Sequence, residues 1–151
     1  GAGTIYRYFE SKEALVNTLY QHWKTYLLDT VTADVSSDLP LREQFHLYWN
    51  RLATFALTYP VAFTFLELHF HAPYLDEQSR TVEEQGHRAL IGFYTECQRQ
   101  GVVKDLPPEV LASMVWGAFV GMVKATLHGC FEITQPILDQ VEASCWEAIR
   151  R

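Results

Sequence analysis

The chain has 151 residues, of which 48% are hydrophobic and 14% aromatic, and its 12 basic and 18 acidic residues give a formal net charge of −6. This composition excludes a disordered chain, which would be poor in aromatics, and the length fits one compact domain of about 100–200 residues. The acidic balance excludes a protein that coats nucleic acid over its whole surface, but it permits a small basic DNA-binding end.

The cysteines and the apolar runs argue against secreted, zinc-binding and membrane-spanning classes of protein. The three cysteines form no Cys-x-x-Cys pair, which argues against a disulfide scaffold or a zinc knuckle and favours reduced thiols in the cytoplasm. The apolar runs are too short for a bilayer crossing, and charged residues interrupt the N-terminal segment. We therefore expect a cytoplasmic protein with neither a membrane span nor a signal peptide.

Apolar residues at helical spacing mark the first two predicted helices. The first covers residues 15–30 and is ended by the polar residues 36–38. The second covers residues 41–59, where apolar side chains recur every three or four residues. Pro40 suits its first turn, and Tyr59 precedes a proline and therefore avoids helical angles.

The second half of the chain predicts further helices. A short, very apolar helix covers residues 61–71, and a longer one begins at the capping-box pattern Thr81-x-x-Glu84 and ends at Gly101. Another begins at the Pro107-Pro108 pair and stops near Gly129, and the last begins at Thr134. About six helices without strand alternation predict an all-α fold.

The first residues concentrate side chains that suit nucleic acid. Hydroxyl groups, a guanidinium and an ammonium bind phosphate oxygens and base edges, and small residues allow a close approach. Residues 1–24 carry a net charge of +1, whereas the rest of the chain carries −7. The side chains concerned are Ala2, Thr4, Tyr6, Arg7, Tyr8 and Lys12.

The string from Gly3 to Leu15, Gly-Thr-Ile-Tyr-Arg-Tyr-Phe-Glu-Ser-Lys-Glu-Ala-Leu, closely resembles the signature of the TetR (tetracycline repressor) family of bacterial one-component regulators. In that family the signature ends the recognition helix of a helix-turn-helix and begins the helix that leads into the ligand-binding domain. The resemblance implies a TetR-like helical bundle. Residues 1–33 would be the end of the helix-turn-helix and the connecting helix, and residues 34–151 the ligand-binding and dimerisation domain.

The resemblance also assigns roles within the N-terminal segment. Thr4, Tyr6, Tyr8 and Lys12 match positions that contact DNA phosphates, and Ala2 and Arg7 match positions at or near the groove. Packing of Tyr6 or Tyr8, and a solvated helix start at Lys12, are the structural alternatives. Because the family's first two helices lie ahead of this segment, we expect the chain to be part of a longer regulator rather than a protein that has lost DNA binding.

Residues 41–128 hold most of the aromatic side chains, more than the core of a small helical domain needs. Ligand cavities are lined by such groups together with a few polar ones, although ordinary core is the alternative for each residue. By resemblance, the cavity would lie among the helices that begin near residues 41, 61, 81 and 108, and it would hold an apolar or aromatic effector. The candidate ligand-binding residues are Trp49, Phe63, Glu67, Phe70, Tyr94 and Trp116.

Glu67, His69 and His71 form a short cluster of possible metal ligands. On a helix Glu67 and His71 share a face while His69 points elsewhere, so a regular helix cannot bring all three to one metal, and a polar pocket or surface is favoured. The chain has no nucleotide-binding glycine loop, Gly-x-Ser-x-Gly or His-Glu-x-x-His motif. We expect no enzyme, metal or cofactor; an enzyme or metalloprotein that uses Glu67 and His71 is the rival interpretation.

The last two helices have the pattern of an interface, with small residues Gly117 and Gly121 that permit close helix approach. The resemblance implies a homodimer joined by a four-helix bundle, which places two recognition helices on a palindromic operator. Burial within one subunit is the alternative. The candidate interface residues are Leu111, Val115, Ala118, Met122, Val141 and Cys145.

Together these features predict a ligand-responsive, DNA-binding transcriptional regulator. The effector would bind better to a conformation in which the two heads are wrongly spaced for DNA, so that a repressor leaves its operator. A DNA-free homodimer that binds small molecules or acts as a scaffold is the alternative function.

Overall fold

The computed structural model describes residue 4 and residues 7–151, and the described residues are almost entirely helical. The helices are α2 (Lys12–Thr32), α3 (Leu41–Thr58), α4 (Pro60–His69), α5 (Glu77–Arg99), α6 (Pro108–Leu127) and α7 (Gln135–Ile149). Extended pairing in this part of the chain is limited to one antiparallel bridge between Val103 and Arg150. The predicted all-α fold is confirmed.

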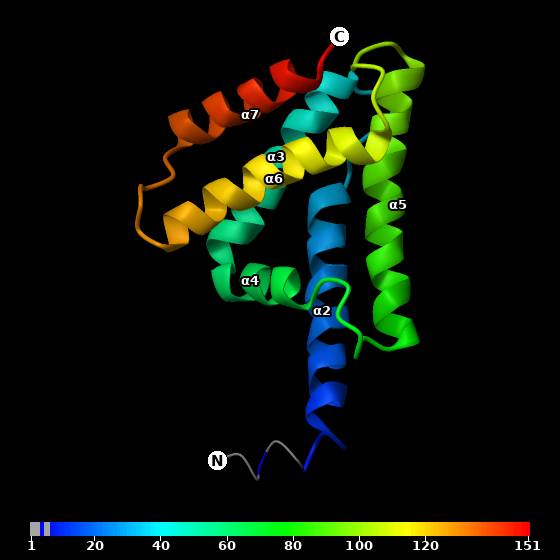
Figure 1. Cartoon of the computed structure of the whole chain (residues 1–151), viewed down its shortest axis with the longest axis vertical. Coiled ribbons are helices and arrows are strands. Elements are labelled where there is room, and N and C mark those ends of the chain that lie inside the picture. The colour runs from blue at the N-terminus through cyan, green and yellow to red at the C-terminus, as the bar shows by residue number, and fades with distance from the viewer. Residues whose placement is uncertain (1–3, 5–6) are drawn as a thin grey trace.

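Packing contacts join the six described helices into one bundle (Figure 1). The two long helices α2 and α5 lie side by side and run in the same direction, and α4 packs across α2. α6 packs against α5 and α7, and α7 also contacts α3 at the other end of the molecule. The first turns of α2 extend below α4 in Figure 1, so the N-terminal end lies away from the C-terminal helices.

Local capping decides where the two long helices begin. Ser11 caps α2, because its hydroxyl accepts a 3.0 Å hydrogen bond from the Ala14 N–H. Asp76 caps α5 in the same way, through a 2.8 Å bond from the Ser79 N–H. The predicted start of this helix at Thr81 is wrong: Thr81 lies within α5, where its hydroxyl donates to the Glu77 carbonyl. A capping-box pattern inside a helix is only a coincidence of residue types.

Two predicted helix boundaries agree with the structure. Gly101 has φ +68°, and the N–H groups of Gly101 and Val102 bond to the Gln98 and Cys97 carbonyls, which closes α5 with a left-handed terminator. At Tyr59 the backbone leaves helical angles and Pro60 then opens α4. This corner turns the chain between α3 and α4.

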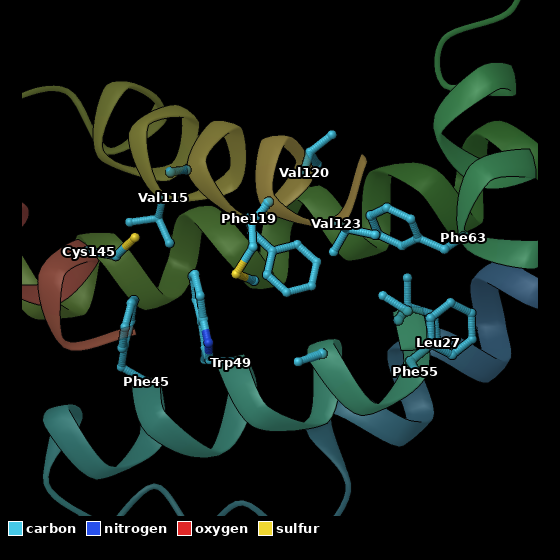
Figure 2. Close-up of a cluster of buried hydrophobic side chains, with 14 of the residues drawn as sticks. Leu27, Phe45, Trp49, Phe55, Phe63, Val115, Phe119, Val120, Val123 and Cys145 are labelled. Carbon is cyan, nitrogen blue, oxygen red and sulfur yellow. The ribbon is translucent and has the colours of Figure 1, made fainter. Parts of the chain in front are cut away.

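The core lies between α3, α4, α6 and α7 (Figure 2), and α2 and α5 add buried side chains to it, among them Leu27 and Tyr94. Buried charge is also part of it: Glu142 on α7 is only 2% exposed and accepts hydrogen bonds from both terminal nitrogens of Arg42 on α3. The Arg42 guanidinium lies 5.5 Å from the Trp146 ring centroid. This pair joins segments 100 residues apart in sequence.

α6 is the one helix among residues 4 and 7–151 that is long and apolar enough to span a membrane by length and composition. Its apolar character has a structural reason, because Leu111, Phe119 and Val123 are buried in the core. Its remaining face, which includes Gly117 and Gly121, is exposed in the single chain. The apolar sequence of α6 therefore supplies the core, and its exposed face is mostly apolar, with charged Glu109 and Lys124 near its two ends.

Candidate functional site

The N-terminal end carries exposed polar side chains ahead of α2. Tyr8 is 79% exposed, and Thr4, Arg7 and Lys12 are also exposed. The Ser11 cap fixes the first turn of α2 directly beside Lys12. Two further predicted DNA contacts, Ala2 and Tyr6, lie outside the described residues. The exposed hydroxyl and cationic groups are free to meet phosphates, and their contact with DNA stays a prediction.

Three of the predicted ligand-binding residues meet around one phenylalanine that the prediction did not include. Phe119 on α6 is fully buried, and its ring centroid lies 5.2 Å from Trp49, 5.9 Å from Phe63 and 6.0 Å from Trp116. We call these four residues the Phe119 cluster. Figure 2 shows Trp49 from α3 and Phe63 from α4 pointing toward Phe119. Its position three residues after Trp116, on the same helical face, was the sequence signal for Phe119.

The other predicted ligand-binding residues lie elsewhere. Phe70 is 48% exposed and its ring centroid is 6.0 Å from the Lys24 ammonium. Glu67 is half-buried; burial raises its pKa, and the charges of Lys124 and Lys24 oppose this shift. Burial lowers the pKa of Lys24, against the charges of Glu83 and Glu67. Glu67 and Phe70 thus belong to a charged region where α4 faces α2.

Tyr94 belongs neither to the Phe119 cluster nor to the charged region at Glu67 and Phe70. It is buried beside Phe93, with ring centroids 5.4 Å apart. Burial raises its pKa, as it raises the pKa of Cys97 on the same helix to about 12. Tyr94 and Cys97 are therefore neutral core groups at ordinary pH. A role for Tyr94 in ligand binding stays a prediction.

Sequence reasoning missed a polar seam between the two long helices. The seam consists of Asn17, Tyr20 and Gln21 on α2 and of Asp76, Ser79 and Glu83 at the start of α5. Its central contact is a 2.8 Å hydrogen bond from the Tyr20 hydroxyl to the Glu83 carboxylate. At its end, the Ser79 hydroxyl donates to the Asn17 side-chain oxygen at 2.7 Å. The seam joins α2 firmly to α5.

His71 completes the seam, and the shared helical face on which the rival metal interpretation of Glu67 and His71 depended is not formed. α4 ends at His69, so Glu67 and His71 do not share a helical face. His71 instead has φ +55°, and both its backbone N–H and its Nδ1 lie 3.0 Å from a Glu83 carboxylate oxygen. A left-handed conformation is uncommon for a residue other than glycine, and the two contacts with Glu83 hold His71 in it. The described residues contain no group of three possible metal ligands close together.

A surface groove of about 360 Å³ lies between α2 and the α3–α4 corner. Uncharged side chains line it, with the rings of Trp23, Tyr59 and Phe65 beside Leu19 and Val61. Val61 is 82% exposed. None of the predicted ligand-binding residues lines this groove.

The predicted interface residues fall on two sides of α6 and α7. Leu111, Val115, Met122 and Cys145 are buried within the single chain, so the structure does not bring these four side chains to the surface. Ala118 is exposed and Val141 is half-exposed. The physical reason is that between Glu109 and Lys124 α6 is apolar or small on nearly every side, so periodicity alone cannot tell its inner face from its outer one. The exposed face of α6 includes the apolar or small residues Val110, Met114, Gly117, Ala118 and Gly121, together with Glu109, Ser113 and Lys124.

Comparison with known proteins gives a consistent result over nearly the whole chain. The model of a family described as "Tetracyclin repressor-like, C-terminal domain" matches residues 20–151. An uncharacterized HTH-type transcriptional regulator from Haemophilus influenzae is 21% identical over 150 residues, which cover 99% of this chain and 79% of that protein.

Solved structures share the fold. A TetR family transcription regulator from Marinobacter aquaeolei has a TM-score of 0.83 at 22% identity, covering 98% of this chain and 78% of that one. A TetR family protein from Vibrio parahaemolyticus has a TM-score of 0.73 at 24% identity, covering 100% of this chain and 82% of that one. The arrangement of α2 to α7 is thus one that these regulators also adopt.

Proposed function

The chain belongs to the TetR family of transcriptional regulators, and on this premise we propose that it is a repressor that leaves a palindromic operator when a small apolar or aromatic effector binds. The observation that carries this proposal is the position of α2. This helix begins at the exposed Lys12, shortly after the exposed Tyr8, and along its length it packs against α3, α4 and α5. A change in the packing of α3, α4 or α5 can therefore move the DNA-contacting end of the chain.

The effector would bind at the Phe119 cluster. Phe63 belongs both to this cluster and to α4, which packs against α2. A molecule inserted beside Phe119 would displace Phe63, and with it α4, against α2. Because the effector favours the displaced conformation, it shifts the population of dimers toward one in which the spacing of the two DNA-binding ends no longer matches the operator.

The second copy would pack on the exposed face of α6 and on α7. Gly117 and Gly121 are exposed, and a Cβ at either position would meet no atom of its own chain within 4 Å. Such a smooth face lets two helices approach closely. A two-fold dimer would set two N-terminal ends one DNA turn, roughly 34 Å, apart.

Duplexes selected from a random-sequence pool by the complete protein provide the test. Binding should weaken steeply as salt is added, since released counterions dominate phosphate contacts. Lys12→Ala should weaken binding to all duplexes alike and reduce the salt slope by about 1 for each subunit. Arg151→Ala, which removes the same charge at the opposite end of the chain, is the matched control and should leave the slope unchanged.

Two outcomes would contradict the proposal. A Lys12→Ala effect confined to one base position would refute a phosphate contact. A protein that dimerises and binds small aromatics, yet retains no duplex from the pool, would be the DNA-free binding dimer instead.

A further inference from the structure

Trp49 holds a buried hydrogen-bond donor without an acceptor. Its side chain is 3% exposed, and no acceptor among the described residues reaches its indole Nε1. One other described atom, the Thr126 hydroxyl oxygen, shares this state. Buried indole N–H groups usually find a partner, because an unpaired donor in an apolar interior costs free energy.

The rings that contact Trp49 are those of uncharged phenylalanines. Phe45 lies stacked on it at 6.2 Å with an interplanar angle of 25°, and Phe119 meets it edge to face at 5.2 Å and 82° (Figure 2). Phe63 and Trp116 complete the cluster. The cluster therefore combines flat apolar surfaces with one unpaired polar group, which is the combination of side chains that lines small-molecule sites.

We propose that the Trp49 indole N–H donates a hydrogen bond to a carbonyl oxygen of the effector, so that the effector class is the neutral aromatic carbonyl compounds. This inference rests on the proposed effector site at the Phe119 cluster and goes further by naming its ligand chemistry. A carbonyl oxygen accepts the bond that no protein atom supplies, and the ring of the ligand packs among the aromatic side chains. A carboxylate would bring an uncompensated charge into an uncharged site, and a hydrocarbon would leave the donor unpaired.

A matched pair of probe molecules isolates the hydrogen bond. Acetophenone and ethylbenzene have similar size and shape, but only acetophenone has a carbonyl oxygen. Calorimetric titration of the complete protein should give about tenfold tighter binding of acetophenone than of ethylbenzene, as expected for one hydrogen bond in a low-dielectric site. In Trp49→Phe this preference should disappear. Trp146→Phe makes the same change at another buried tryptophan that packs on Phe45, and it should keep the preference.

Nuclear magnetic resonance of the indole groups gives a direct second readout. The chain has four tryptophans and hence four indole N–H signals, and Trp49→Phe identifies the one from Trp49. In the free protein this signal should have the upfield proton shift of an unbonded indole. Acetophenone should move it downfield and ethylbenzene should not.

The outcomes separate the inference from the function on which it rests. Equal binding of both probes, unaffected by Trp49→Phe, would overturn the carbonyl assignment and leave the effector site standing. Binding of neither probe would overturn the carbonyl assignment together with the placement of the effector at the Phe119 cluster. A Trp49 indole signal that is already downfield in the free protein would overturn the inference, since the donor would then have a partner.

Discussion

Tyr20 on α2 and Glu83 on α5 are joined by a 2.8 Å hydrogen bond, and both residues are buried. Glu83 also receives the His71 backbone N–H, so one carboxylate fixes α2, α5 and the end of α4 relative to each other. Any movement of α2 must therefore preserve or break this contact. The Tyr20–Glu83 hydrogen bond should therefore affect both the stability of the fold and the proposed movement of α2.

Removal of the Tyr20 hydroxyl should be costly. Tyr20→Phe leaves the buried Glu83 carboxylate with one donor fewer, and we expect a loss of about 1–3 kcal/mol in the free energy of unfolding. Denaturant titration at fixed protein concentration measures this loss. A cost no larger than that of an exposed change such as Tyr8→Phe would show that the buried bond contributes little.

Glu83 should make stability depend on pH. Burial alone raises the pKa of Glu83, but the His71 N–H and Tyr20 hydroxyl bonds and the charges of His71 and Lys24 outweigh it, so the pKa is lowered overall. Since the unfolded chain binds the proton more readily, Glu83 stabilises the fold above its ordinary pKa of 4.5, and this stabilisation is lost as the pH falls through its lowered folded pKa.

Glu83→Gln should therefore be less stable than the native chain above about pH 4.5, with the two stability curves converging in more acid solution. Thermal unfolding over a pH series measures both curves. Glu132→Gln, at an exposed position in the α6–α7 loop, is the control and should run parallel to the native curve. Parallel curves for Glu83→Gln would contradict the lowered pKa.

Replacement of Arg42 should leave the buried Glu142 carboxylate without its ion-pair partner. Arg42→Met leaves Glu142, which is 2% exposed, without its main partner, and we expect a cost of about 2–3 kcal/mol because Arg42 itself is partly exposed. The double change Arg42→Met with Glu142→Leu should recover most of this loss, since it removes both charges together. A double variant as unstable as Arg42→Met would show that the packing of the two side chains, and not their charge, accounts for the stability that this pair contributes.

Two glycines inside α5 should respond differently to alanine. Gly92 has open space around it, so Gly92→Ala should raise the free energy of unfolding by about 0.5–1 kcal/mol through helix propensity. A Cβ at Gly86 would lie 2.9 Å from a Leu28 methyl carbon on α2, so Gly86→Ala should gain less. Denaturation midpoints of the two variants test whether Gly92→Ala gains more stability than Gly86→Ala. Equal gains in the two variants would contradict this expectation.

The dimer face can be tested without disturbing the fold of the single chain. Gly121→Glu has open space in its own chain, but it would bury a charge between two copies on the proposed face. Sedimentation should show a dimer weakened by at least about tenfold, a cost of about 1.4 kcal/mol. Gly92→Glu, an equally open position on α5, should keep the native state of association.

Some features of this protein follow from local sequence alone. The helices and several of their ends could be predicted, because apolar periodicity, Pro60 and Gly101 act within a few residues of the chain. The family could also be predicted, because its signature is one continuous string. The aromatic residues that meet at Phe119 were partly foreseen, since aromatic side chains at helical spacing must be buried somewhere.

Which groups pair in space was decided only by the packing of the helices. Asn17, Tyr20 and Glu83 read as ordinary polar helix positions, yet they form a buried seam, because α5 supplies partners some 60 residues away. Likewise, most of the sequence of α6 is apolar on nearly every side, and only its packing against α5, α7 and Trp49 of α3 shows that Leu111 faces inward while Gly121 faces out. Periodicity specifies that a helix forms and how apolar its faces are, whereas long-range contacts specify which face is covered and what each buried polar group bonds to.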